Sequence, residues 1–265
     1  MDQTFSFRQA PVRYRDDGQG MAVVLLHGFL ETLEMWDELA VELQRTCRVI
    51  RVDLPGHGGT GCFGYLHPME LMAEVVHAVL QRCKVRKCVM IGHSMGGYVT
   101  LAFADRYPDY LKGYGLYHSS SRADTGRKKA DRDQAIRLVK QNHRSFIRKA
   151  IPLLFRHKFR VQYREEVNRL KKAALKGVSK QGIIAALEGM KQRPNREVIL
   201  RFSPVPVLFR AGQRDPVFPF QSLEEQFTLS EHIRPVVLKE AGHMSFIEDR
   251  KPAFKALKRF VNQCR

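Results

Sequence analysis

The feature that most constrains this chain is the alternation of strand-like apolar runs with helical segments. Residues 21–26 and 88–92 are continuous apolar runs, and 48–53 is a further strand-like segment. Strands that are buried on both faces have this composition, and they occur in parallel sheets covered by helices. Residues 35–45 and 68–82, which lie between the runs, carry apolar residues at helical spacing. The alternation predicts an α/β fold with a parallel sheet and right-handed crossover connections.

The alternation stops after a fourth buried strand, which we predict at residues 111–117. The following stretch contains three or four helical patterns and no strand, and the alternation resumes with a strand at 205–210. We therefore predict a core formed by residues 1–118 and 202–265, with a helical cap at 119–201 inserted after the fourth parallel strand.

The remaining segments complete the predicted core. Residues 5–9 and 12–14 alternate apolar and polar side chains and predict an opening hairpin. A helix is expected near 220–229, a last strand at 233–239 and a closing helix at about 245–262.

Nearly all of the positive charge lies in the predicted cap. The whole chain has a formal net charge of +18, and residues 119–200 contain 22 Lys and Arg against 7 Asp and Glu. Such a field could steer an anionic acyl substrate toward a site. The alternative is a solvated helix surface with no ligand. Nucleic-acid binding is not expected, because no zinc finger, RNA-binding signature or aromatic platform accompanies the charge.

The composition of the chain also indicates the cellular compartment in which the protein is expected to lie. The five cysteines are odd in number and include no CxxC pair, which disfavours a disulfide framework or a zinc site and favours a reducing cytoplasm. Residues 1–10 have no apolar run that would indicate a signal peptide. No uncharged apolar stretch approaches the roughly 18 residues of a membrane helix. We expect a cytoplasmic protein without a membrane or metal partner.

The strongest chemical signal is the G-x-S-x-G sequence at residues 92–96, which lies between a predicted strand and a predicted helix. A serine on such a turn is held in a strained conformation and exposed at the edge of the sheet, and the flanking glycines leave room for the bend. The following helix N-terminus favours developing negative charge. We predict that Ser94 is a nucleophile.

A serine hydroxyl needs a base, and four histidines lie where predicted parallel strands end. His243 follows the last strand and is our candidate for the base. His93 adjoins Ser94 but should point away from it along the turn. His118 could line the pocket, and His27, for which a structural role is expected, could do so as well.

Three acids compete to orient the base. Asp215 lies just past the next-to-last strand, beside the strand that delivers His243, and completes the chain order Ser, Asp, His. It would hold the tautomer of His243 and stabilise the imidazolium. Asp53 is expected to fix its own loop, and Asp124 to be solvated or to cap a helix.

Attack of a serine on a carbonyl forms an oxyanion, which needs preorganised donors. We expect the backbone N–H of Met95 to be one donor. The second is expected to be the N–H of Phe29, in the loop that follows the first parallel strand.

These motifs together resemble the α/β-hydrolase superfamily. The resemblance rests on residues 27–29, 53–58, 92–97, Asp215 and 242–243, and it covers the predicted core. It implies an eight-stranded, mostly parallel sheet with a helical cap and no cofactor. Relatives with aspartate at the nucleophile position are dehalogenases and epoxide hydrolases, and Ser94 argues against both.

The expected function is hydrolysis of a small carboxylic ester, thioester or lactone through an acyl-enzyme. Two alternatives stay open. The same three residues could cleave a C–C bond, or the chain could be a ligand receptor that turns over slowly. The predicted cap, which selects the substrate in this superfamily, shows no specific likeness to any one group of its members.

Overall fold

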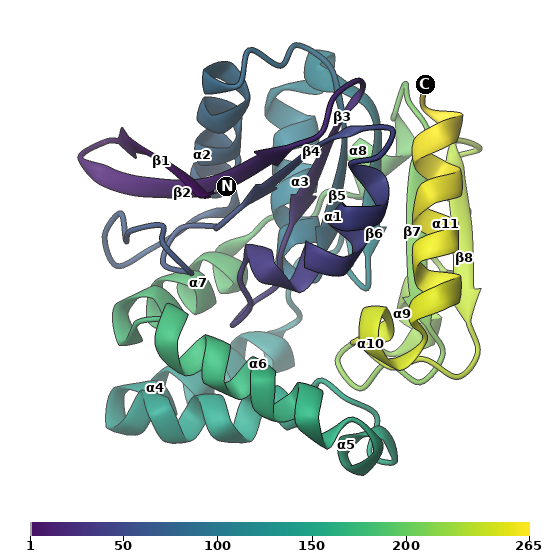
Figure 1. Cartoon of the computed structure of the whole chain (residues 1–265). Coiled ribbons are helices and arrows are strands. Elements are labelled where there is room, and N and C mark those ends of the chain that lie inside the picture. The colour runs from purple at the N-terminus through teal and green to yellow at the C-terminus, as the bar shows by residue number, and fades with distance from the viewer. Residues whose placement is uncertain (1) are drawn as a thin grey trace.

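The computed structural model describes residues 2–265, which form one sheet flanked by helices (Figure 1). The eight strands are β1 (Asp2–Phe7), β2 (Ala10–Asp17), β3 (Ala22–Leu26), β4 (Arg48–Val52), β5 (Cys88–His93), β6 (Leu111–Tyr117), β7 (Val207–Gly212) and β8 (Ile233–Leu238). Their order in the sheet is β1-β2-β4-β3-β5-β6-β7-β8. The hairpin of β1 and β2 is antiparallel to the rest, and β4, β3, β5, β6, β7 and β8 are parallel. The predicted eight-stranded, mostly parallel sheet is confirmed.

The central strands are apolar because they are covered on both faces. All residues of β3, β5 and β7 are buried. Figure 1 shows α1 (Asp37–Leu43) and α11 (Arg250–Gln263) on one face, and α2 (Met69–Arg82) and α3 (Met95–Arg106) on the other. Burial of these apolar surfaces supplies most of the driving force for the fold.

Five helices occupy the chain between β6 and β7, where the sequence predicted helices and no strand. They are α4 (Gly126–Leu153), α5 (Phe159–Gln162), α6 (Arg164–Gly177), α7 (Lys180–Gln192) and α8 (Glu197–Arg201). We call them the inserted helices. In Figure 1, α4 to α7 lie together beyond one end of the sheet, and α8 returns to pack against α3.

The helix α4 is kinked at Asn142, which has non-helical backbone angles. The Asn142 side chain accepts a hydrogen bond of 2.9 Å from the N–H of Ser145, so it acts as an N-cap for the second half of the helix. The apolar stripe of α4 therefore continues across two helical segments.

Two predicted helices in the C-terminal part differ from the structure. The helix expected near 220–229 is the short α9 (Phe220–Glu224). The closing helix is divided into α10 (Ser245–Glu248) and α11, because Asp249 between them has an extended φ of −149°. None of the helices that the structure describes combines the length and the hydropathy needed to span a bilayer.

Candidate active site

Ser94 lies on a sharp turn between β5 and α3. Its φ of +51° and ψ of −113° form a combination that L-residues rarely adopt, so the turn is strained. The sequence permits this turn because a Cβ at Gly92 would overlap the carbonyl oxygen of Gly96. The N–H of Ser94 donates to the Tyr117 carbonyl at 2.9 Å, which ties the turn to β6. Among residues 2–265, the Ser94 hydroxyl makes no hydrogen bond, so it is available to a ligand.

His243 and Asp215 meet at the carboxyl edge of the sheet. Asp215 follows β7 and His243 follows β8, and His243 Nδ1 donates to Asp215 Oδ2 at 2.9 Å. The other carboxylate oxygen accepts from the N–H groups of Val217 and Phe218 at 2.8 and 3.1 Å, which fixes the Asp215 side chain. Burial alone would raise the pKa of Asp215, but the charge and hydrogen bonds of the neighbouring histidines outweigh it and lower that pKa well below its usual range.

A second histidine shares this carboxylate. His118 Nδ1 lies 3.0 Å from Asp215 Oδ2, and His118 Nε2 lies 2.7 Å from the hydroxyl of Ser245. That hydroxyl is in turn 2.8 Å from the phenol oxygen of Tyr117. Burial lowers the pKa of His118 to about 4, so a neutral ring donates from Nδ1 and accepts at Nε2. His118 does not line the cavity, and it helps to hold Asp215 in place.

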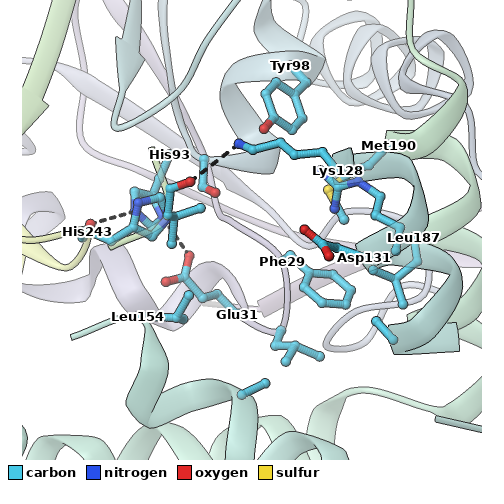
Figure 2. Close-up of a pocket in the computed structure, with 16 residues that line it drawn as sticks. Phe29, Glu31, His93, Tyr98, Lys128, Asp131, Leu154, Leu187, Met190 and His243 are labelled. Atoms are coloured by element: carbon cyan, nitrogen blue, oxygen red, sulfur yellow. Dashed lines mark hydrogen bonds and ion pairs between the residues drawn. The ribbon is translucent and has the colours of Figure 1, made fainter. Parts of the chain in front are cut away.

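Ser94 and His243 line the same cavity, which has a volume of about 260 Å³. Most of its other lining residues are apolar, and they include residues of the loop after β3, of α4 and of α7. Figure 2 shows Leu187, Met190 and Asp131 facing His93 and His243 across this space.

The expected pocket-lining roles of His118 and His27 are not found. Neither residue is among those that line the cavity, and both are fully buried. His27 Nε2 accepts from the N–H of Leu54 at 2.9 Å, so this ring fixes the loop after β4. A residue at the end of a parallel strand lies at the carboxyl edge of the sheet. Its place in the sequence does not determine where its side chain points.

The loop that carries Phe29 is held by a buried carboxylate that the sequence analysis missed. Glu31 accepts from the N–H of Gly28 at 2.6 Å and lies 2.8 Å from His93 Nδ1. His93 Nε2 donates to the carbonyl of His243 at 3.1 Å. His93 therefore connects the loops of Phe29, Ser94 and His243 through its two ring nitrogens.

The Glu31 carboxylate and the His93 ring favour each other's charged forms. Burial alone would raise the pKa of Glu31, but His93 outweighs burial and lowers it. Burial alone would lower the pKa of His93, but Glu31 outweighs burial and raises it. Both ring nitrogens of His93 therefore carry protons, in agreement with the two acceptors that they face.

The backbone N–H groups of Phe29 and Met95 are the two donors that the sequence predicts for an oxyanion. The N–H groups of Phe29 and Met95 find no hydrogen-bond acceptor within residues 2–265. Both residues belong to segments next to Ser94, at the loop after β3 and at the first position of α3. The Glu31 carboxylate holds the loop of Phe29 in place through the N–H of Gly28.

The sequence predicted the structural role of Asp53 but not the burial of Asp124. Asp53 accepts from the N–H groups of Leu33 and Gly59, so it fixes its loop as expected. Asp124 is buried rather than solvated, because it pairs with Arg132 and, at 2.7 Å, with Arg193. The position of Asp124 as an isolated acidic residue in a segment rich in arginine could have indicated this pairing.

One group of residues has the donor types of a metal site. His118, Asp215 and His243 offer ligand atoms that all lie within 4.8 Å of one another. Both imidazole Nδ1 atoms, however, already lie at hydrogen-bond distance from one carboxylate oxygen. Hydrogen bonding accounts for the geometry of this cluster.

A mostly parallel sheet with a strained serine at its carboxyl edge, and with a histidine that is held by an aspartate and lines the same cavity, is typical of the α/β-hydrolase class. The chain belongs to the α/β hydrolase fold family, whose sequence model matches residues 21–250.

The chain is similar to proteins of several named activities, among them esterases, an acetyltransferase component and a non-heme haloperoxidase of Rhodococcus erythropolis. The chain is 29% identical, over 86% of its length, to the dihydrolipoyllysine-residue acetyltransferase component of the acetoin cleaving system of Pseudomonas putida, and it spans 60% of that relative's length. It is 28% identical to a pimeloyl-(acyl-carrier protein) methyl ester esterase of Neisseria meningitidis, with 89% of this chain and 91% of the relative covered. The structure of a thermophilic esterase from Thermogutta terrifontis, with malate bound, is similar with a TM-score of 0.91 at 27% identity, covering 100% of this chain and 99% of that one.

Proposed function

We propose that the chain is a serine hydrolase that cleaves a small carboxylic ester, thioester or lactone through an acyl-enzyme. Ser94 attacks the carbonyl carbon while His243 Nε2 takes the hydroxyl proton, and His243 returns this proton to the leaving group. Water then attacks the acyl-serine, with His243 again acting as base, and releases the acid. The N–H groups of Phe29 and Met95 stabilise the oxyanion in both steps.

The observation that carries the proposal is the orientation of His243. Because its Nδ1 is held by Asp215 at 2.9 Å, the other ring nitrogen is free to act on a group in the cavity that Ser94 also lines. Hydrogen bonds between a nucleophile and its base often tighten only when the substrate binds. We therefore expect the Ser94 hydroxyl and His243 Nε2 to come within hydrogen-bond distance in the substrate complex.

Cavity size and lining support a small substrate. A volume of about 260 Å³ lies just below the range of about 300–1,000 Å³ that is typical of ligand sites. Two of the named relatives are esterases, which supports ester chemistry.

A fluorophosphonate probe, followed by a series of p-nitrophenyl esters of increasing chain length, tests the proposal. We expect wild type to be labelled and to hydrolyse the short esters. Ser94→Ala should abolish both, and His243→Ala should reduce turnover by several orders of magnitude. Labelling that persists in Ser94→Ala would refute the assignment of the nucleophile.

The same experiment separates the alternatives. Stoichiometric labelling with negligible turnover of every ester would indicate a ligand receptor. Release of C–C cleavage products from a β-diketone, with no ester hydrolysis, would indicate a C–C bond hydrolase that uses the same residues.

A further inference from the structure

Lys128 extends a primary amine into the cavity from the first turn of α4. The amine donates to the carbonyl of Val217 at 3.4 Å and lies 4.3 Å from the centre of the Phe218 ring. That ring also packs against His243, with 5.8 Å between ring centres. Figure 2 shows the Lys128 side chain crossing the cavity toward Tyr98 and His93. An inserted helix therefore places a cationic group beside the proposed catalytic histidine.

The other charged groups that are buried around the cavity have partners of opposite charge. Glu31 is paired with His93. Arg132 is paired with Asp124, which also binds Arg193. The Arg193 guanidinium additionally lies 3.8 Å from the ring of Tyr98. Each of these charged groups therefore has a partner of opposite charge within the protein.

Lys128 differs, because within residues 2–265 it has no carboxylate partner. Asp131, which also lines the cavity, is exposed to solvent and forms no ion pair with Lys128. An ammonium group has three hydrogens to donate, and the carbonyl of Val217 accepts only one of them. Because Lys128 lines the cavity, whose other lining residues are mostly apolar, its remaining donors are available to a ligand there.

Several local effects disfavour a cation at this position. The positive end of the helix dipole lies at the first turn of α4, where Lys128 is placed. Burial lowers the pKa of the Lys128 amine, and the charges of Arg132 and Arg193 lower it further, whereas the charges of Asp124 and Asp215 oppose the shift. A charged residue at an unfavourable position of this kind often belongs to a functional site.

We propose that Lys128 binds a carboxylate carried by the ester that the cavity accepts. This inference rests on the proposed function and narrows it to anionic esters. The carboxylate would supply the missing counter-charge and accept the free ammonium hydrogens in charge-assisted hydrogen bonds. The apolar residues Leu187 and Met190 would contact the hydrocarbon part of the same substrate.

A purely structural role is the competing explanation. Lys128 joins α4 to the segment that follows Asp215, so it could serve only to hold that segment in place. The two roles predict different results, because the loss of a purely structural contact would lower kcat/KM equally for all esters. A substrate pair that differs only in charge separates them.

The experiment compares kcat/KM for mono-4-nitrophenyl adipate with kcat/KM for 4-nitrophenyl hexanoate, which has an acyl chain of the same length. A second pair, 4-acetoxybenzoate and phenyl acetate, places the charge on the leaving group instead. The variants are Lys128→Met, Lys128→Arg and the matched control Lys129→Met, which removes the same charge from the adjacent, exposed position of α4. Ser94→Ala is assayed alongside them.

We expect Lys128→Met to lower the anionic-to-neutral ratio about 10- to 100-fold in one of the two pairs, the range for a lost hydrogen bond to a charged group. Lys128→Arg should keep the ratio within about tenfold of wild type, since it keeps the charge. Lys129→Met should leave it unchanged. The inference is overturned if Lys128→Met lowers both members of each pair equally or changes neither. If Ser94→Ala keeps its activity, the proposed function itself fails.

Discussion

At the scale of single residues, the site depends on hydrogen bonds that fix which nitrogen of each histidine carries a proton. His243 and His118 both face Asp215 through Nδ1, and His93 faces an acceptor through each nitrogen. Three histidines in one small region therefore have three separate roles. His243 faces the cavity, His118 supports Asp215, and His93 holds the loops together.

The Glu31–His93 pair makes stability depend on pH in a defined window. The lowered pKa of Glu31 contributes stability above about pH 4.5, its ordinary value, and this contribution is lost as pH falls. The raised pKa of His93 contributes stability below about pH 6.5, and this contribution is lost as pH rises through the raised value. We expect Glu31→Gln to lower the free energy of unfolding by about 2 kcal/mol near pH 5.5.

Urea unfolding of wild type and Glu31→Gln at about pH 5.5 and about pH 9 measures this difference. The difference should shrink as pH rises through the raised pKa of His93, because the ring then loses its proton. The exposed position Glu38→Gln serves as the control and should change little at either pH. An equal loss at both pH values would contradict this expected pH dependence.

At the scale of elements, the inserted helices are held to the sheet by close backbone contacts. A Cβ at Gly182 in α7 would overlap the carbonyl oxygen of Gly56, in the loop after β4. A β-bridge between His57 and Val178 lies in the same region. These contacts position α7, which supplies Leu187 and Met190 to the cavity.

Gly182→Ala is therefore expected to destabilise the protein by about 1–3 kcal/mol, because the added methyl group cannot fit without a backbone shift. Thermal unfolding checks this, and kcat/KM for a short ester should fall as α7 moves. Gly126→Ala is the matched control, since a Cβ there meets nothing within 4 Å. Equal stability of the two variants would contradict the close packing of α7.

At the scale of the whole molecule, charge is unevenly distributed, and this affects encounter with substrate. The segment 119–200 holds 22 of the 45 basic residues but only 7 of the 27 acidic ones. A field of one sign raises the local concentration of oppositely charged ligands and is screened by salt.

We expect kcat/KM for an anionic ester to fall several-fold between about 0.05 and 0.5 M NaCl, whereas kcat/KM for its neutral analogue changes little. Steady-state assays of the two esters over this range measure the effect. Parallel salt dependence for the two esters would assign the basic residues to a solvated surface without a steering role.

The sequence predicted the fold well, because strand burial leaves a local pattern. The runs at 21–26 and 88–92 became β3 and β5, and the break after 117 marked the inserted helices. Helix ends were less predictable. Asp249 interrupts the last helix and Asn142 kinks α4, and neither change appears in the apolar spacing.

The sequence predicted which residues lie at the site better than it predicted which atoms their side chains contact. Strand ends placed Ser94, Asp215 and His243 at one edge of the sheet. The directions of His27 and His118, the burial of Asp124 and the unpaired amine of Lys128 depend on residues far away in the chain. Such contacts follow from tertiary packing, which residue spacing does not encode.

The central claim is that an acyl group is transferred to Ser94, and mass spectrometry of the enzyme during turnover tests it most directly. Rapid acid quenching with a p-nitrophenyl ester should reveal an acyl adduct on the peptide that contains Ser94. The adduct should form and decay at least as fast as kcat, and Ser94→Ala should show neither adduct nor turnover. Turnover without an adduct, or an adduct confined to another residue, would contradict the account.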